Sequence, residues 1–265
     1  MTIAQPMLFS DLRRFRAACT FALLMAAPFF GACASKQATR PAELNSPYDT
    51  SAEVVLAVAP LRNESGVSVV DELAVSDALV GEIEQTPGVS VLPMNRTLAA
   101  MRALRMPQVE TPADALALAK AAGADGLIVG SITAWHPYDP PTLGLSLGIF
   151  GRSPYMRAPP DPTVDPTALK AARSEPETTD RHQVIGALST VSQTFDAHNG
   201  STRELVRAYA QGRHDPSSAL TWRRYLASMG LYAKFACHEA SRLLFDAERQ
   251  RLRGPQTRQQ ASAAQ

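Results

Sequence analysis

Runs of valine, leucine and isoleucine alternate along the first half of the chain with segments whose apolar residues follow helical spacing. A continuous apolar run bounded by polar residues is typical of a strand buried on both faces, whereas apolar residues three and four positions apart indicate a helix. The expected order is a strand at 53–60, a helix at 69–85, a strand at 89–93, helices at 95–104 and 111–123, and a strand at 124–135. This order is that of an α/β layer.

Local signals mark where the helices begin and end. Asn95 is expected to cap the helix that follows it, because its side chain can accept a hydrogen bond from the first turn. Thr111, followed by Pro112 and Asp114, is a helix start signal with proline at the first helical position. Gly123 ends that helix.

The second half of the chain changes in composition. Prolines and aromatic residues mark a hinge at 136–141. The expected elements are then a strand at 141–151, a proline-rich surface insertion at 152–183, a strand at 184–195, an Asn-Gly turn, a strand at 203–208, helices at 217–228 and 231–252, and a disordered tail at 251–265. We therefore predict one α/β domain over 51–250: a three-layer sandwich with a mixed sheet, plus C-terminal helices at 217–252.

The amino terminus has the pattern of an export signal over residues 1–32. Three arginines precede an uncharged segment that ends in Phe30, Gly31 and Ala32, directly before Cys33. Small residues before a cysteine resemble the bacterial lipobox, and this resemblance implies that Cys33 is lipidated and becomes the first mature residue. The alternative is an ordinary signal peptide with an incidental cysteine. A permanent membrane helix is disfavoured, because the apolar run is shorter than the roughly 20 residues required and Pro28 interrupts it.

Lipidation would place the protein on a membrane. Several acyl chains anchor a protein stably, whereas one holds it only marginally. No Asp follows Cys33 at the next positions, and in the resembling lipoproteins this implies sorting to the outer membrane, with the domain facing the periplasm. The polar, unpatterned residues 33–50 are expected to form a flexible tether.

Charge and cysteine content narrow the function further. The formal net charge is +1, and removal of 1–32 leaves the chain near neutral without a basic stripe, which argues against nucleic acid as a partner. Cys19 lies in the signal and Cys33 at its end, so Cys237 has no partner for an internal disulfide. Its apolar neighbours predict that it is a buried small hydrophobe.

Catalytic and metal-binding patterns are not found in the sequence. The histidines, at 136, 182, 198, 214 and 238, do not lie in pairs at metal-ligand spacing. Neither a glycine-x-serine-x-glycine elbow nor a phosphate-binding loop occurs. We therefore expect no catalytic residues, no metal and no cofactor, and a protein that is not an enzyme.

The order of elements resembles known envelope proteins. The residues that carry the resemblance are the loop Asn63-Glu64-Ser65-Gly66, the junction from Gly123 to Thr133, and the phrase from Phe195 to Gly200. They resemble the amino-terminal module of periplasmic TolB and the related curli-secretion lipoproteins and penicillin-binding-protein activators over about 53–210. The resemblance implies an α/β fold and no catalytic residues.

One cluster has the composition of a protein contact patch. Trp135, His136, Tyr138 and Asp139 lie beside two prolines, and aromatic residues next to prolines form contacts at low cost in chain ordering. The alternative is a hinge whose rings cap the end of the sheet.

These observations favour a non-enzymatic bacterial envelope lipoprotein that binds a partner protein, of unknown identity, or assists an assembly. It would contact the membrane through Cys33, and a homo-oligomer is compatible with this organisation. The alternative is a subunit of an oligomeric outer-membrane secretion pore related to the curli-secretion lipoprotein. In that case the alternating segments 141–151 and 184–195 would be membrane strands, both long enough to span.

Overall fold

The computed structural model describes residues 43–48, 53–154, 156, 186–214 and 217–263, with side chains up to residue 253. The predicted export signal at 1–32, the lipidation site Cys33 and most of the insertion at 152–183 lie outside the described residues.

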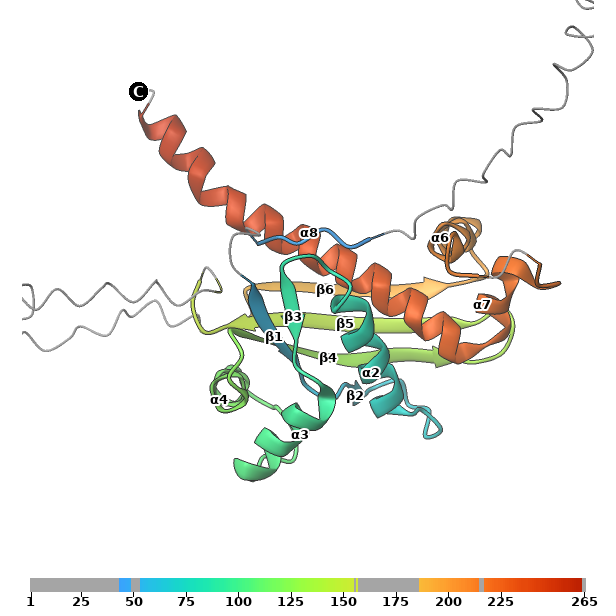
Figure 1. Ribbon diagram of the computed structural model, residues 1–265, viewed down its shortest axis with the longest axis horizontal. Coiled ribbons are helices and arrows are strands. Elements are labelled where there is room, and N and C mark those ends of the chain that lie inside the picture. Colours follow the sequence, from blue (N-terminus) through green and yellow to red (C-terminus); the bar gives the residue numbers. More distant parts are fainter. Residues whose placement is uncertain (1–42, 49–52, 155, 157–185, 215–216, 264–265) are drawn as a thin grey trace, which may run out of the picture. The chain divides into compact units, whose positions relative to one another are not determined.

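A six-stranded mixed sheet forms the centre of the domain (Figure 1). The strands lie in the order β3-β1-β4-β5-β6, and the short β2 pairs with β4. β1 is parallel to β3 and β4, β2 is parallel to β4, and β5 is antiparallel to both β4 and β6. The strand bounds are β1 Val54–Val58, β2 Arg62–Asn63, β3 Val89–Val91, β4 Gly126–His136, β5 Thr142–Gly151 and β6 Ser189–Asp196.

Helices lie on both sides of this sheet. Their bounds are α2 Glu72–Ile83, α3 Met94–Ala103, α4 Pro112–Ala122, α6 Gly200–Ala210, α7 Arg224–Ala227 and α8 Met229–Ala263, with a short 3₁₀ turn, η2, at Thr221–Arg223. Neighbouring residues of β4 enter separate cores, because successive strand side chains point to opposite faces. Ile128 packs in the core that includes side chains of α2 and α8, and Leu127 packs in the core that includes side chains of α3 and α4. The predicted three-layer sandwich with a mixed sheet and C-terminal helices is confirmed.

The start and stop signals act as expected at α4 and differently at α3. Thr111 and Asp114 form a reciprocal capping box, with N–H to oxygen distances of 2.9 and 3.1 Å, and Gly123 ends α4 with a φ of +78°. The helix expected to be capped by Asn95 begins instead at Met94, directly after Pro93. Pro93 fixes a φ suited to entering a helix, so a side-chain cap is not used there.

The predicted strand at 203–208 is wrong, because these residues belong to helix α6. Its buried residues are Thr202, Val206, Tyr209 and Ala210, a spacing of four, three and one that forms a helical stripe. The few apolar residues of this segment also fit the alternation of a strand. Burial of Tyr209 in the core favours the helix over the strand. The C-terminal segment differs as well, since α8 runs to Ala263 across most of the tail that was expected to be disordered. Its alanine, arginine and glutamine residues have high helix propensity.

The described part of the predicted tether is packed against the domain. Leu44 is 2% exposed and Tyr48 is 7% exposed, and both lie in the core that includes α8. The Arg249 guanidinium donates to the carbonyl oxygen of Asn45 at 3.0 Å. Residues 43–48 therefore belong to the fold, although their polar sequence indicated a free linker.

Cys237 is fully buried in α8, as predicted. Its Sγ lies 3.7 Å from the carbonyl oxygen of Val75. Burial raises the pKa of the Cys237 thiol, and the nearby Glu82 carboxyl acts in the same direction. The residue is therefore a packing element of the α2–α8 interface.

A polar cluster lies in the same interface. Glu82 is buried, accepts a hydrogen bond from the Tyr209 hydroxyl at 2.7 Å and lies 3.2 Å from Nδ1 of His238. Burial, followed by Glu82, raises the pKa of Tyr209. The cluster joins α2, α6 and α8 by satisfying the polar groups they bury together.

Candidate protein-binding face

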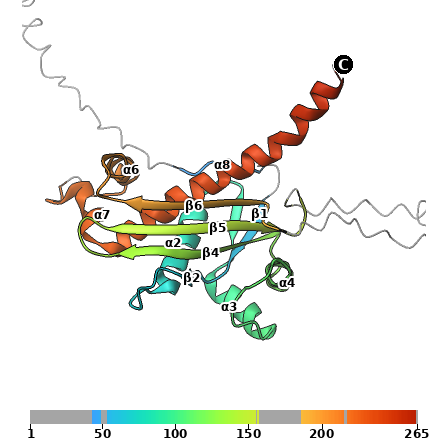
Figure 2. The same cartoon turned by 180° about the vertical axis from the view of Figure 1, so that it is seen from behind.

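One face of β4, β5 and β6 carries small and hydroxyl-bearing residues. Figure 2 shows these strands with α2 and α8 behind them. The alternation of β5 explains the asymmetry, because Leu143, Leu145, Leu147 and Ile149 face the helices while the intervening positions face the other way. We call the outward side the open face; its small and hydroxyl-bearing residues are Ser131 and Thr133 on β4, Thr142, Gly144, Ser146 and Gly148 on β5, and Thr190, Ser192 and Thr194 on β6. The apolar residues Val129, Ala134 and Phe150 lie on the same side.

The strand register brings these residues into rows across the sheet. Ser131 is paired with Ser146, and Ser146 with Ser192. Thr133, Thr190, Ser192 and Thr194 are exposed, Ser146 is half-buried and Ser131 is buried. The result is a flat surface of neutral hydrogen-bonding groups with small side chains.

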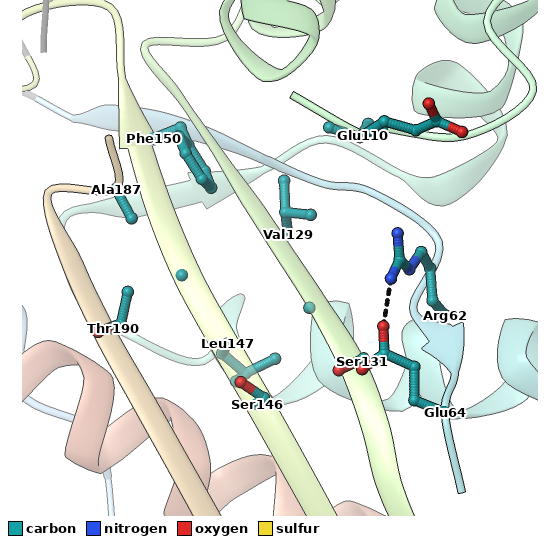
Figure 3. Close-up of a pocket in the computed structure, with 13 residues that line it drawn as sticks. Arg62, Glu64, Glu110, Val129, Ser131, Ser146, Leu147, Phe150, Ala187 and Thr190 are labelled. Atoms are coloured by element: carbon teal, nitrogen blue, oxygen red, sulfur yellow. Dashed lines mark hydrogen bonds and ion pairs between the residues drawn. The ribbon is translucent and has the colours of Figure 1, made fainter. Parts of the chain in front are cut away.

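A shallow hollow of about 270 Å³ marks one end of the open face (Figure 3). Val129 and Phe150 form part of its apolar wall, and Ser131, Ser146 and Thr190 supply hydroxyls. A second hollow, of about 390 Å³, shares Arg62, Glu64 and Val109 with the first. The two hollows therefore adjoin at Arg62 and Glu64.

Glu64 is the centre of the charged group at this end. Figure 3 shows the Arg62 guanidinium directed at the Glu64 carboxylate, beside Ser131. Hydrogen bonds from Arg62 and then Ser131 lower the pKa of Glu64. A carboxylate with a lowered pKa is a weaker base, so it does not favour removing a proton from Ser131 near neutral pH. The Glu64 carboxylate therefore acts as a hydrogen-bond acceptor for Arg62 and Ser131.

The structure places one residue of the predicted contact patch against the core and the other three at the surface. Trp135 is half-buried against the core that includes α8, on the side of its pair partner Leu143. The rings of His136 and Tyr138 are 5.5 Å apart in an edge-to-face arrangement, and Tyr138 is 73% exposed at the tip of the β4–β5 hairpin. Asp139 is also exposed. His136 pairs with Thr142, so the hairpin tip continues the open face at the end opposite the hollow.

The sequence interpretation missed the hydroxyl rows. Gly144, Ser146 and Gly148 alternate with large apolar residues, and this alternation was used only to predict a strand. It also indicates that the second side of the strand is not packed under a helix, since a covered side would need bulky apolar residues.

Within the described ranges, no group of three or more histidine, cysteine, aspartate or glutamate side chains could hold a metal ion. Three histidines have polar partners: His198 with Asp196, His214 with a backbone carbonyl, and His238 with Glu82. Of the helices that the structure describes, none combines the length and apolar character needed to cross a bilayer.

The fold is an α/β sandwich with a hydroxyl-rich sheet surface that the described helices leave exposed along β6. Neither the known protein families nor the curated proteins include a match to the sequence. Solved structures with a similar chain path include the LpoB C-terminal domain from Salmonella enterica, with 12% identity over 55% of this chain and 84% of that chain, at a TM-score of 0.37. A lipoprotein from Neisseria meningitidis matches with 16% identity over 58% and 94%, at a TM-score of 0.35.

A hypothetical protein from Chlamydia trachomatis matches over 76% of this chain and 97% of its own length, with 11% identity and a TM-score of 0.33. At these identities and scores the likeness carries no conclusion about function. The function proposed below depends on the residues of this chain.

Proposed function

We propose that this protein is a non-enzymatic, lipid-anchored bacterial envelope protein that binds a partner protein through the open face. The observation that most directly supports this proposal is the open face. β1 and β4 contribute to apolar cores on both sides of the sheet. On one side, β6 presents exposed threonine and serine side chains and β5 presents half-buried ones. Neutral hydroxyls beside a shallow apolar hollow suit a protein surface with neutral hydrogen-bonding groups.

The lipobox-like segment before Cys33 supports attachment to a membrane, and the residues after it favour the outer membrane, with the domain in the periplasm. The structure does not support the pore alternative. It places 142–151 in β5, between β4 and β6, with one side packed in the core that includes α8.

Site-specific photo-crosslinking tests the binding face. A photoreactive amino acid is placed at Ser146 or Thr190 in the full-length protein in its own envelope, and matched controls carry it at Glu84 and Arg102, which are exposed on the helical sides. We expect one discrete protein adduct from the open-face positions only. Adducts of equal yield at the helical positions, or none at any position, would refute this face as the interface.

A blocking substitution provides a second measurement. Ser192→Arg adds a long charged side chain to an exposed position and is expected to change stability by less than about 0.5 kcal/mol. The same substitution should abolish the adduct at Thr190. Labelled palmitate incorporated by the native chain and not by Cys33→Ser tests the anchor separately.

A further inference from the structure

Residues 43–48, which precede β1, are held against α8. We call this segment the N-terminal clasp; in Figure 1 it is the blue piece that runs beside α8. Leu44 and Tyr48, near its two ends, are both buried in the core that contains Leu244 and Phe245 of α8. Between them, the carbonyl of Asn45 accepts the hydrogen bond from Arg249. The clasp is thus fixed at its start, middle and end.

The clasp ends on a buried polar junction. Glu248 of α8 is fully buried and accepts hydrogen bonds from the Ser189 hydroxyl at 2.6 Å and from Nε of Arg251 at 2.7 Å. Arg251 also donates to the carbonyl of Pro154 at 2.6 Å. The Tyr48 hydroxyl is buried near this group, and burial followed by the Glu248 charge raises the pKa of Tyr48, which keeps it neutral. The junction joins α8 to the start of β6 and to the residues after β5.

We infer that the clasp sets how far the domain can reach from the membrane. The inference depends on the proposed lipid anchor at Cys33. A fully extended chain from Cys33 to Leu44 spans at most about 40 Å, whereas from Cys33 to Val54 of β1 it spans at most about 75 Å. Docking of six residues on α8 therefore roughly halves the maximum reach.

The clasp also sets the direction of attachment. α8 packs on the face of the sheet opposite to the open face. A tether that leaves the domain from the α8 side makes the open face point away from its own attachment point. A partner bound to the open face would consequently lie on the side of the domain away from the point where the tether leaves it.

Insertions on either side of the clasp test this inference. Eight Gly-Ser residues are inserted before Glu43 in one variant and between residues 50 and 51 in a second, in the full lipidated protein. A donor dye is attached through Arg102→Cys on exposed α3, with acceptor dye on the headgroups of phosphatidylethanolamine–phosphatidylglycerol vesicles. We expect energy transfer to fall for the first insertion and to stay at the native level for the second, because a docked clasp isolates the second from the tether.

Equal losses from both insertions, or no loss from either, would overturn the inference. Flotation of the native protein with the vesicles tests the lipid anchor by itself, so that a failure of the anchor is recognised separately.

Docking of the clasp can also be measured without a membrane. Leu44→Ala should lower the midpoint of thermal unfolding by at least about 4 °C, since a fully buried leucine is truncated. The control Leu220→Ala, at a position 52% exposed, should leave it unchanged, and an unchanged midpoint for Leu44→Ala would overturn docking.

Discussion

Adding a single methyl group at two glycines of neighbouring strands tests the assignment of the two sheet faces. Gly130 of β4 faces the packed side. A Cβ atom built there lies 2.4 Å from the backbone carbonyl oxygen of Ser146 and 2.6 Å from the side chain of Leu147. Gly148 of β5 belongs to the open face, and a Cβ there meets its nearest neighbour, Ala187, at an ordinary 3.4 Å.

The expected cost follows from these distances. At Gly130 the nearest atom is backbone, so β4 and β5 must separate locally by about 1 Å to reach ordinary contact. Overpacking of this kind costs about 1–3 kcal/mol. In a domain of this size each kcal/mol lowers the unfolding midpoint by about 2–4 °C, so Gly130→Ala should lower it by roughly 2–12 °C. Gly148→Ala should change stability by less than about 1 kcal/mol and in the stabilising direction, because glycine in a strand loses more entropy on folding than alanine.

Thermal unfolding followed by circular dichroism distinguishes the two variants, and the native protein under the same conditions is the reference. A fall for Gly148→Ala as large as that for Gly130→Ala would mean that the open face is packed. The assignment of a binding surface to it would then fail.

Three further perturbations have defined outcomes. Tyr209→Phe removes a donor from the buried Glu82 carboxyl and should destabilise the domain by about 1–3 kcal/mol in chemical denaturation; no change would contradict the hydrogen bond. Ser76→Ala removes the buried hydroxyl that accepts the Leu61 N–H at 2.9 Å, and a similar loss is expected, together with shifted amide NMR signals in β2. The pKa of Glu64 lies below its ordinary 4.5, so its contacts are complete above that pH and are lost as the pH falls through the lowered pKa; a carbon-13 NMR titration with a midpoint at or above 4.5 would contradict this.

Much of the fold could be predicted because its signals are local. The valine-rich run of β1 and the long apolar run of β4 indicate buried strands, and the Thr111 and Gly123 signals fix both ends of α4. These features depend on neighbouring residues in the sequence. Their physical causes, alternation and capping, act over one or two turns or strands.

The rest depends on contacts between distant residues. α6 was predicted as a strand because its short apolar pattern fits a strand as well as a helix. The hydrogen bond from Tyr209 to Glu82, which favours the helix, joins residues that are far apart in the sequence. The clasp was predicted as a tether because burial of Leu44 requires α8. The open face was missed for a related reason: alternation predicts that a strand has two sides, but only the assembled helices decide which side they cover.

The seclusion of Cys237 has a practical consequence. Alkylating reagents attack the thiolate, and both the shielding of this sulfur and its raised pKa suppress that form while the α2–α8 interface is closed. With signal removal and lipidation of Cys33 as proposed, this sulfur would be the remaining thiol of the mature chain. Its alkylation rate in living cells would therefore report how often the interior opens, without any engineered probe.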